Sequence, residues 1–386
     1  MLFALVGAPN KGKSSLFNAL TSGNAVVADY PFTTIDPNKG VAYASAPCPC
    51  RQLGVTCAPR NSRCEGGVRR IPINVIDVAG LVPGASEGKG MGNQFLNDIA
   101  AADALVCVAD ASGRTDVEGK PSQGCASWHD VAMVRGELAA WFAKLLERHC
   151  QRAGGKGLPE LARLLSGANV TELQLKKAVA AAGMPENLAA WHGGDFLTVA
   201  RELLASSKPF IVAANKCDLP GAVENIEEMR SELEGVPVIA TSADCELALT
   251  RASAKGFIAY DGKTITCLQP SYPSQIDAAL KKLEGFIAAN RSTGCRELVD
   301  KIVFDVLGLI VAYPVEDEHK YCDHNGSVLP DAILLPRGST PVDLAFKIHT
   351  DLGKGFLYAV DAKTKMKLAR DAKLENGSVV KVLSSR

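Results

Sequence analysis

Short apolar runs alternate with amphipathic segments along the first half of the chain. Five of these runs are almost continuously apolar, and each ends at small or polar residues. Continuous apolar runs are typical of strands that are covered on both faces. Their alternation with helical patterns predicts an α/β fold with a doubly wound, mainly parallel sheet. The predicted strands are residues 2–7, 73–77, 104–110, 210–215 and 236–243.

The strand pattern stops between Asp110 and Phe210, and helical spacing replaces it. Residues 134–149 show this spacing most clearly, with few β-branched side chains. A single crossover helix does not need a hundred residues. We therefore predict an insertion of several helices at about residues 115–205.

Residues 257–268 alternate around an Asp-Gly pair, which predicts a β-hairpin. Helical spacing follows at residues 274–289 and again at 296–307.

From about Gly308 onward the pattern is that of a small α+β module. It predicts a strand, an Asn-Gly-Ser turn, a second strand, one helix and two further strands. Thr340 is expected to cap the helix, with Pro341 at its first position. We therefore expect a first domain at residues 1–308 and a second domain at residues 309–386.

Composition narrows the classes of partner. The 386 residues suffice for two or three domains, and 42 basic side chains balance 42 acidic ones. Zero net charge gives no bulk attraction to membranes or nucleic acid, so neither a membrane nor sequence-specific DNA is expected as a partner. The N-terminal apolar run has no basic lead-in, which favours a first strand over a signal peptide. We expect a cytoplasmic protein whose twelve cysteines are mostly reduced.

The segment GAPNKGKS, residues 7–14, matches the phosphate-binding pattern G-x-x-x-x-G-K-[ST] between a predicted strand and a predicted helix. Its glycines let backbone N–H groups surround phosphates at the start of a helix. Lys13 is expected to reach the β- and γ-phosphates, and the Ser14 hydroxyl to bind Mg²⁺. The nucleotide-binding residues predicted in this loop are Asn10, Lys11, Gly12, Lys13, Ser14 and Ser15.

A second motif, D-x-x-G, begins where the predicted strand 73–77 ends. Asp77 suits a carboxylate that holds Mg²⁺ directly or through water. The backbone N–H of Gly80 is placed to meet the γ-phosphate, so we count Gly80 with Lys13 among the catalytic residues. The next residue is Leu81, whose side chain cannot orient an attacking water as a polar residue would.

A third motif, NKCD at residues 215–218, follows another predicted strand. The Asp218 carboxylate can accept hydrogen bonds from N1 and N2 of guanine, and adenine lacks that donor pair, so GTP is favoured over ATP. Asn215 is expected to join this loop to the phosphate loop, and the stem of Lys216 to cover the base. After the last strand, Ser242 and Ala243 offer backbone N–H groups to guanine O6. Motifs in this order predict a GTP-binding domain.

These motifs resemble those of the Obg-related GTPases, specifically the YchF subfamily in its archaeal form. The resemblance rests on the phosphate loop, on residues 28–40 and 77–99, and on the tail 333–356, and it extends over nearly the whole chain. It implies an OBG-type G domain with a helical insertion and a C-terminal TGS domain of ubiquitin-like fold. It also implies a Mg²⁺-dependent switch that hydrolyses GTP to GDP slowly and acts with the ribosome or a related translation particle.

The same resemblance assigns two further residues. Thr34 is similar to the switch threonine that binds Mg²⁺ in the triphosphate state, and we count it as catalytic. Leu81 matches the hydrophobic residue that the family carries in place of a catalytic glutamine.

Asn10 has two interpretations. In related GTPases with an asparagine here, a K⁺ ion offsets the charge of the transition state, which would make Asn10 a catalytic residue. Alternatively, Asn10 only braces the phosphate loop.

Asp218 departs from much of the subfamily. Many YchF proteins have glutamate at this position and prefer ATP, whereas this chain keeps the full N-K-x-D motif. An alternative function is an ATP-hydrolysing stress or redox-response factor that acts through protein binding. A third is a nucleotide-gated scaffold that does not hydrolyse.

Four cysteines, Cys48, Cys50, Cys57 and Cys64, occur in one predicted loop. Four thiolates can bind Zn²⁺ tetrahedrally and stabilise a segment that lacks its own core. The spacing C-x-C-x6-C-x6-C is not that of a standard zinc finger. Redox-active thiols and simple loop cysteines therefore remain alternatives.

Overall fold

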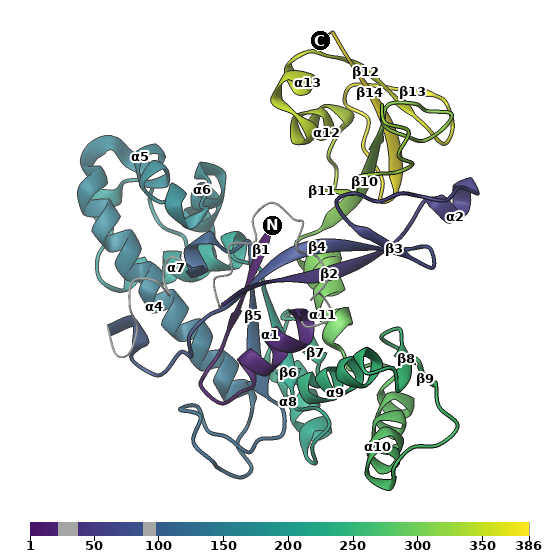
Figure 1. The fold of residues 1–386 in the computed structure, drawn as a ribbon. Coiled ribbons are helices and arrows are strands. Elements are labelled where there is room, and N and C mark those ends of the chain that lie inside the picture. The colour runs from purple at the N-terminus through teal and green to yellow at the C-terminus, as the bar shows by residue number, and fades with distance from the viewer. Residues whose placement is uncertain (22–37, 88–97, 386) are drawn as a thin grey trace. The chain divides into compact units, whose positions relative to one another are not determined.

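The computed structural model describes residues 1–21, 38–87 and 98–385, which fold into two compact units (Figure 1). The first unit contains residues 1–21, 38–41, 74–87 and 98–298. The second contains residues 42–73 and 299–385. Thr34 lies outside the described residues. The domain boundary expected near residue 308 stays a prediction.

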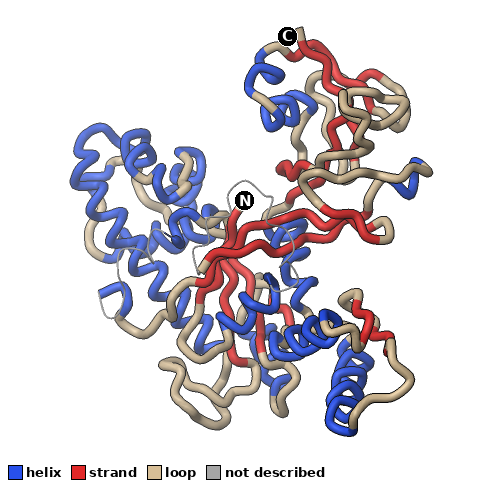
Figure 2. Tube along the Cα trace, viewed as in Figure 1, coloured by secondary structure: helices blue, strands red, loops and turns tan. Residues whose placement is uncertain are grey.

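The largest sheet has seven strands, in the order β2-β4-β1-β5-β6-β7, with β3 paired to β4. Figure 2 shows the strands in red and the helices in blue. β1 runs parallel to both β4 and β5, and β5, β6 and β7 are parallel to one another. The doubly wound, mainly parallel sheet is therefore confirmed. Its strands are β1 (Leu2–Val6), β2 (Lys39–Pro47), β3 (Arg63–Glu65), β4 (Val68–Asp77), β5 (Ala104–Asp110), β6 (Phe210–Asn215) and β7 (Val238–Ala240).

Strands β2, β3, β4 and β7 differ from the sequence prediction, which has no strand at Arg63–Glu65. β4 begins at Val68, five residues earlier than predicted, and β2 was not predicted at all. The buried face of β2 consists of Ala42, Ala44 and Ala46, and alanine is a weak strand signal. β7 ends at Ala240 because the Ser242 side chain caps the helix that begins at Ala243.

Helices pack against the sheet within the first unit. α1 (Lys13–Thr21) follows β1, α8 (Ala222–Glu232) follows β6, and α9 (Ala243–Ala254) follows β7. All seven residues of β5 are buried, as expected for a strand covered on both faces. A short turn of helix, η2 (Ala85–Glu87), lies after β4.

The predicted insertion is helical and has its own core. Its four helices are α4 (Trp128–Ala153), α5 (Gly157–Leu164), α6 (Glu172–Ala181) and α7 (Gly194–Ser207), joined by the short turns η3 (Gly154–Lys156), η4 (Ser166–Ala168) and η5 (Leu188–Ala190). Phe142, Leu161, Leu175 and Leu203 lie among its buried residues. Residues 111–127 form an irregular loop in front of α4.

The predicted hairpin is present as β8 (Ile258–Tyr260) and β9 (Ile265–Cys267), which pair antiparallel. α10 (Ser274–Asn290) packs beside it through Leu280 and Ile287. The next predicted helix is divided into α11 (Cys295–Asp300) and a π-helical turn, η6 (Lys301–Val306).

The C-terminal part of the second unit is the predicted α+β module. Its sheet has the order β11-β10-β14-β12-β13, in which β10 and β14 are parallel and the other pairs are antiparallel. Thr340 caps α12 in a reciprocal capping box and Pro341 lies in its first turn, as predicted. The elements are β10 (Leu309–Val315), β11 (Ile333–Pro336), α12 (Pro341–Ile348), α13 (Thr350–Lys354), β12 (Phe356–Asp361), β13 (Lys367–Leu368) and β14 (Ser378–Ser384).

The cysteine-containing segment packs against this module. It includes α2 (Cys50–Leu53) and β3, and the Gly66–Gly67 turn joins β3 to β4. Backbone N–H groups of Ala58 and Arg60 donate to carbonyls of Val328 and Pro330, at 2.8 and 2.7 Å. These contacts join parts of the chain that are far apart in sequence.

Within the described residues, no helix is long and apolar enough to cross a membrane.

Candidate nucleotide site

The phosphate loop, residues 7–14, joins β1 to α1 and is built closely against its neighbours. A Cβ atom on Gly7 would lie 2.5 Å from the carbonyl oxygen of Val108 in β5. A Cβ on Gly12 would lie 2.3 Å from Nδ2 of Asn215, and its φ of +88° also favours glycine. Both glycines are therefore required by close approach, and the loop leads directly into the N-terminus of α1, where backbone N–H groups favour anions.

Lys13 is buried, and its Nζ donates to the carbonyl oxygen of Ala8 at 2.9 Å. Burial lowers the pKa of this amine, and the nearby Asp77 carboxylate opposes that shift. A Cβ on Gly80 would lie 3.3 Å from the same Nζ and 3.1 Å from the backbone nitrogen of Pro9, which is a tight fit. Lys13 and Gly80 therefore lie together, as their predicted roles require.

The predicted Mg²⁺ ligands Ser14 and Asp77 also lie together. The Ser14 hydroxyl donates to Oδ2 of Asp77 at 2.7 Å. The other carboxylate oxygen, Oδ1, is buried and has no hydrogen-bond partner among the described residues. A hydroxyl and a carboxylate with an unsatisfied oxygen suit a hard cation such as Mg²⁺. Thr34, the third predicted ligand, is outside the described residues.

The N-K-x-D loop, residues 215–218, is attached to the phosphate loop through Asn215, as the sequence predicts. Its Nδ2 donates to the Lys11 carbonyl at 3.2 Å, and its Oδ1 accepts from the Ala243 N–H at 3.1 Å. Oδ1 of Asp218 accepts from the Ser242 hydroxyl at 2.6 Å, which orients the carboxylate. Ser242 and Ala243 are both buried at the start of α9.

A brace that the sequence analysis missed extends from the end of β5. Asp110 is buried there and accepts from Nζ of Lys216 at 2.8 Å, and the same Nζ donates to the Asn10 carbonyl at 3.0 Å. Burial of Asp110 acts against its charge, but hydrogen bonds from Lys216, Ser112 and Thr115 outweigh it and lower the pKa of this carboxyl. Lys216 therefore joins the N-K-x-D loop to the phosphate loop.

Two phosphate-loop side chains contact the irregular loop 111–127. Nδ2 of Asn10 donates to the Gly119 carbonyl at 2.9 Å. Lys11 is fully buried, and its Nζ donates to carbonyls of Thr115 and Asp116 and lies 2.7 Å from Oδ2 of Asp130. The Lys11 side chain is thus occupied within the protein, which leaves its backbone N–H as the group that could contact a phosphate.

No local signal in the sequence identifies this brace, because its partners are about a hundred positions apart. Only the apolar strand that ends in Asp110, and the acidic Asp130 beside a helical pattern, could have suggested buried charges in need of partners.

Leu81 is a core residue in this structure. Its side chain is 2 % exposed and belongs to the same buried cluster as Val78, Ala85 and Ile99. Its N–H donates to the Gly7 carbonyl at 2.9 Å. The side chain is therefore packed in the core of the first unit.

The second unit contains the other predicted site. The structure brings Cys48, Cys50, Cys57 and Cys64 together, with all four sulfur atoms within 4.8 Å of one another.

These features together define a P-loop GTP-binding protein. They are a phosphate loop before α1, a carboxylate beside the serine of that loop, and an N-K-x-D motif that is hydrogen-bonded to it. Family models agree. Residues 2–128 match the family described as 50S ribosome-binding GTPase, residues 213–317 match the Obg-like GTPase YGR210-like, G4 motif-containing domain, and residues 326–384 match the TGS domain.

Whole-length comparisons extend this result. A GTP-binding protein of Methanocaldococcus jannaschii is 45% identical over 391 residues, which cover 100% of this chain and 99% of the relative. The crystal structure of a GTP-binding protein from Pyrococcus horikoshii OT3 is 35% identical, with a TM-score of 0.80 and full coverage of both chains. The YchF GTPase of Schizosaccharomyces pombe shares the fold at 20% identity, with a TM-score of 0.56 and coverage of 99% and 97%. The chain belongs to the Obg-like GTPases of the YchF type.

Proposed function

We propose that this protein hydrolyses GTP slowly in a Mg²⁺-dependent reaction and uses the cycle as a switch on the ribosome or a related translation particle. The observation that carries the proposal is the convergence of Lys13, Ser14 and Asp77 at the start of α1, with Asp218 held by Ser242 on the adjacent loop.

The phosphates would be bound by the backbone N–H groups of the phosphate loop and by the Lys13 ammonium. Lys13 would exchange its hydrogen bond to the Ala8 carbonyl for the β- and γ-phosphate oxygens. The Gly80 N–H would meet the γ-phosphate. Ser14, Asp77 and Thr34 would hold Mg²⁺, which supplies charge neutralisation at the phosphates.

Slow turnover follows from Leu81. Orientation of the attacking water is a major part of phosphoryl-transfer catalysis, and this side chain is packed in the core. Hydrolysis would therefore rest on charge neutralisation and on backbone groups.

Asn10 would contribute by holding K⁺ near the transferred phosphate. Its φ of +61° turns the loop at this point, and its Nδ2 is bonded to Gly119, so Oδ1 remains the group available to a cation. Exchange of K⁺ for Na⁺ at constant ionic strength is expected to lower the single-turnover rate. An equal rate in the two salts would leave Asn10 with the bracing role alone.

The ribosomal role is supported by the description of the matching G-domain family and by the TGS domain. Cosedimentation of the full chain with ribosomes, in a non-hydrolysable GTP analogue and in GDP, tests it. We expect more bound protein with the analogue. No binding in either state would contradict the ribosomal part alone.

Single-turnover hydrolysis of GTP with and without Mg²⁺ tests the enzymatic part. Asp77→Asn is expected to lower the rate or the apparent Mg²⁺ affinity by about 10- to 100-fold. Asp277→Asn, at a partly exposed position of α10 in the same unit, is the matched control and should leave the rate unchanged. Hydrolysis that does not depend on Mg²⁺ or on Asp77 would overturn the proposal.

A further inference from the structure

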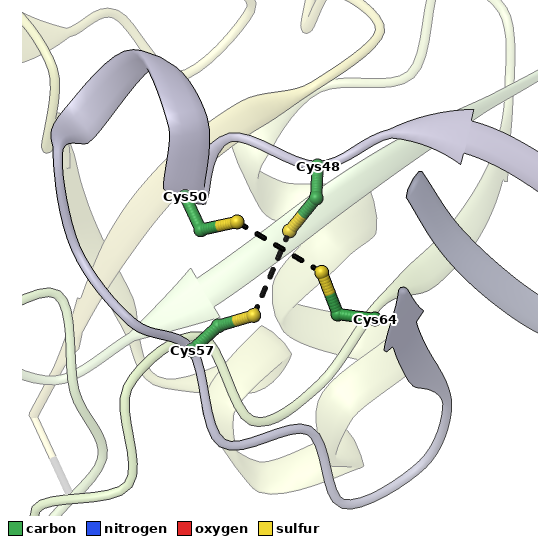
Figure 3. Close-up of side chains that lie close together, drawn as sticks. All are labelled: Cys48, Cys50, Cys57 and Cys64. Carbon is green, nitrogen blue, oxygen red and sulfur yellow. Dashed lines mark hydrogen bonds between the residues drawn. The ribbon is translucent and has the colours of Figure 1, made fainter. Parts of the chain in front are cut away.

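The second unit contains a side-chain cluster that the nucleotide site does not use. Cys48 follows β2, Cys50 begins α2, Cys57 lies in the next loop and Cys64 lies in β3. Figure 3 shows the four side chains pointing toward a common centre, and their sulfur atoms all lie within 4.8 Å of one another. Four separate local structures thus converge on one point.

The distances between sulfur atoms indicate ligands around one ion. They are 3.9 Å between Cys48 and Cys57 and 3.8 Å between Cys50 and Cys64. Four sulfurs placed tetrahedrally about 2.3 Å from a zinc ion lie roughly 3.8 Å apart. A disulfide would need about 2.05 Å between its sulfurs. Because every sulfur lies within 4.8 Å of the other three, the four can share one ion and do not form two separate pairs.

The backbone around the cluster is fixed by its own hydrogen bonds. Gly54 ends α2 in the left-handed region at φ +64°, and the Val55 N–H returns to the Cys50 carbonyl at 3.0 Å. The Cys48 N–H donates to the Gly67 carbonyl at 2.9 Å. Cys48 and Cys50 are also buried. The thiols are therefore held in position by the surrounding fold.

A positively charged side chain, Arg69, lies next to the cysteine cluster. Arg69 is opposite Cys64 in the β3–β4 ladder, where paired residues share a face, and it is completely buried. Its guanidinium donates to the Leu329 carbonyl at 2.8 Å and lies 5.2 Å from the Tyr313 ring. It has no carboxylate partner among the described residues, and its Nε is unsatisfied there. Since buried charges are normally paired, a negative group is expected nearby.

We propose that Cys48, Cys50, Cys57 and Cys64 bind one Zn²⁺ ion as thiolates in a structural site. Four thiolates and Zn²⁺ carry a net charge of −2, which Arg69 partly offsets. Each thiol releases its proton to solvent on binding, and no oxidation or reduction occurs. With four protein ligands the ion has no open position, which distinguishes a structural site from a catalytic one.

The site would stabilise the loop that contacts the C-terminal module. This loop, residues 55–62, contains Cys57. The N–H groups of its Ala58 and Arg60 donate to the carbonyls of Val328 and Pro330. Asn61 adds hydrogen bonds to both backbone groups of Ala332. Zinc would therefore fix this loop in the conformation that binds residues 328–332.

The metal content of the full chain, purified under reducing conditions, tests the proposal by inductively coupled plasma mass spectrometry. We expect one zinc per chain in the wild type, and a loss of at least tenfold in bound zinc per chain in Cys57→Ser and Cys64→Ser. Cys267→Ser, an exposed cysteine outside the cluster, should keep one zinc. Replacement by Co²⁺ should give the intense visible bands of a tetrahedral thiolate site, a readout that needs no variant. Four free thiols without metal, a mass loss showing two disulfides, or bound iron would each overturn the assignment.

Discussion

The ammonium of Lys11 lies 2.7 Å from the carboxylate of Asp130, and the two side chains are 0% and 5% exposed. Lys11 belongs to the phosphate loop and Asp130 to the first turn of α4. The pair therefore anchors the nucleotide-binding loop to the helical insertion. Burial raises the pKa of the Asp130 carboxyl, and the bond to Lys11 opposes that shift.

Removal of one partner should be costly, because it leaves the other charge buried alone. Asp130→Ala is expected to lower the free energy of unfolding by about 3–5 kcal/mol. Guanidinium titration followed by tryptophan fluorescence measures it, since Trp128, Trp141 and Trp191 all lie at or within the insertion. The exposed pair of Asp277 with Lys281 is the control, and Asp277→Ala should cost about 0–1 kcal/mol. Equal losses in the two variants would contradict a buried, energetically important pair.

Leu81 should behave as a core residue in mutagenesis. Leu81→Ala is expected to destabilise the protein by about 2–5 kcal/mol, because it opens a cavity in the cluster that includes Val78 and Ile99. Leu81→Gln should also destabilise and should leave the single-turnover rate of GTP hydrolysis no higher than that of the wild type. A rate increase of tenfold or more in Leu81→Gln would show that this side chain reaches the nucleotide after all.

The sequence predicts much of this fold, because its strongest patterns are local. The continuous apolar run of β5 and the Thr340–Pro341 helix start each carry their signal within a few residues. β2 escaped prediction because alanines form its buried face. The contact of residues 55–62 with 328–332 also escaped, because no local pattern records which distant segment covers a loop.

The residues of the nucleotide site likewise fall into those that the sequence predicts and those that only the structure shows. Lys13, Ser14 and Asp218 are found from motifs, since the chemistry fixes both residue type and spacing. Asp110 and Asp130 are found only from the structure, because they act on the phosphate loop through Lys216 and Lys11, each about a hundred positions away. The four cysteines are partly predictable. Their closeness in the sequence indicates a cluster, and only the structure shows that the four sulfur atoms lie together.

Lys208 is expected to make the stability of the fold depend on pH in a defined direction. Its Nζ is buried and donates to carbonyls of Ala100 and Ala102, each at 2.6 Å. Burial lowers the pKa of this amine to about 8, and Asp103 opposes the shift. Between pH 8 and about 10.4, the usual lysine pKa, the folded chain loses this proton while the unfolded chain keeps it. Lys208 should therefore make the free energy of unfolding increase as the pH rises through that range.

Comparison of wild type with Lys208→Met isolates the effect. The Tm of the wild type relative to the variant is expected to rise between pH 8 and 10. A difference in Tm that stays constant over this range would contradict a lowered pKa at Lys208.

The most direct measurement is a side-by-side titration of GTP, ATP and xanthosine triphosphate with Mg²⁺, on the wild type and on Asp218→Asn. The wild type should prefer GTP over ATP by tenfold or more, which is about 1.4 kcal/mol. In the variant, the amide N–H can donate to the xanthine 2-carbonyl, so preference should move from GTP to the xanthine nucleotide. Asp244→Asn, exposed on α9 close to the site, should keep the preference for GTP. If the wild type binds ATP as well as or better than GTP, Asp218 does not read the base and an ATP-dependent function takes the place of the GTP switch.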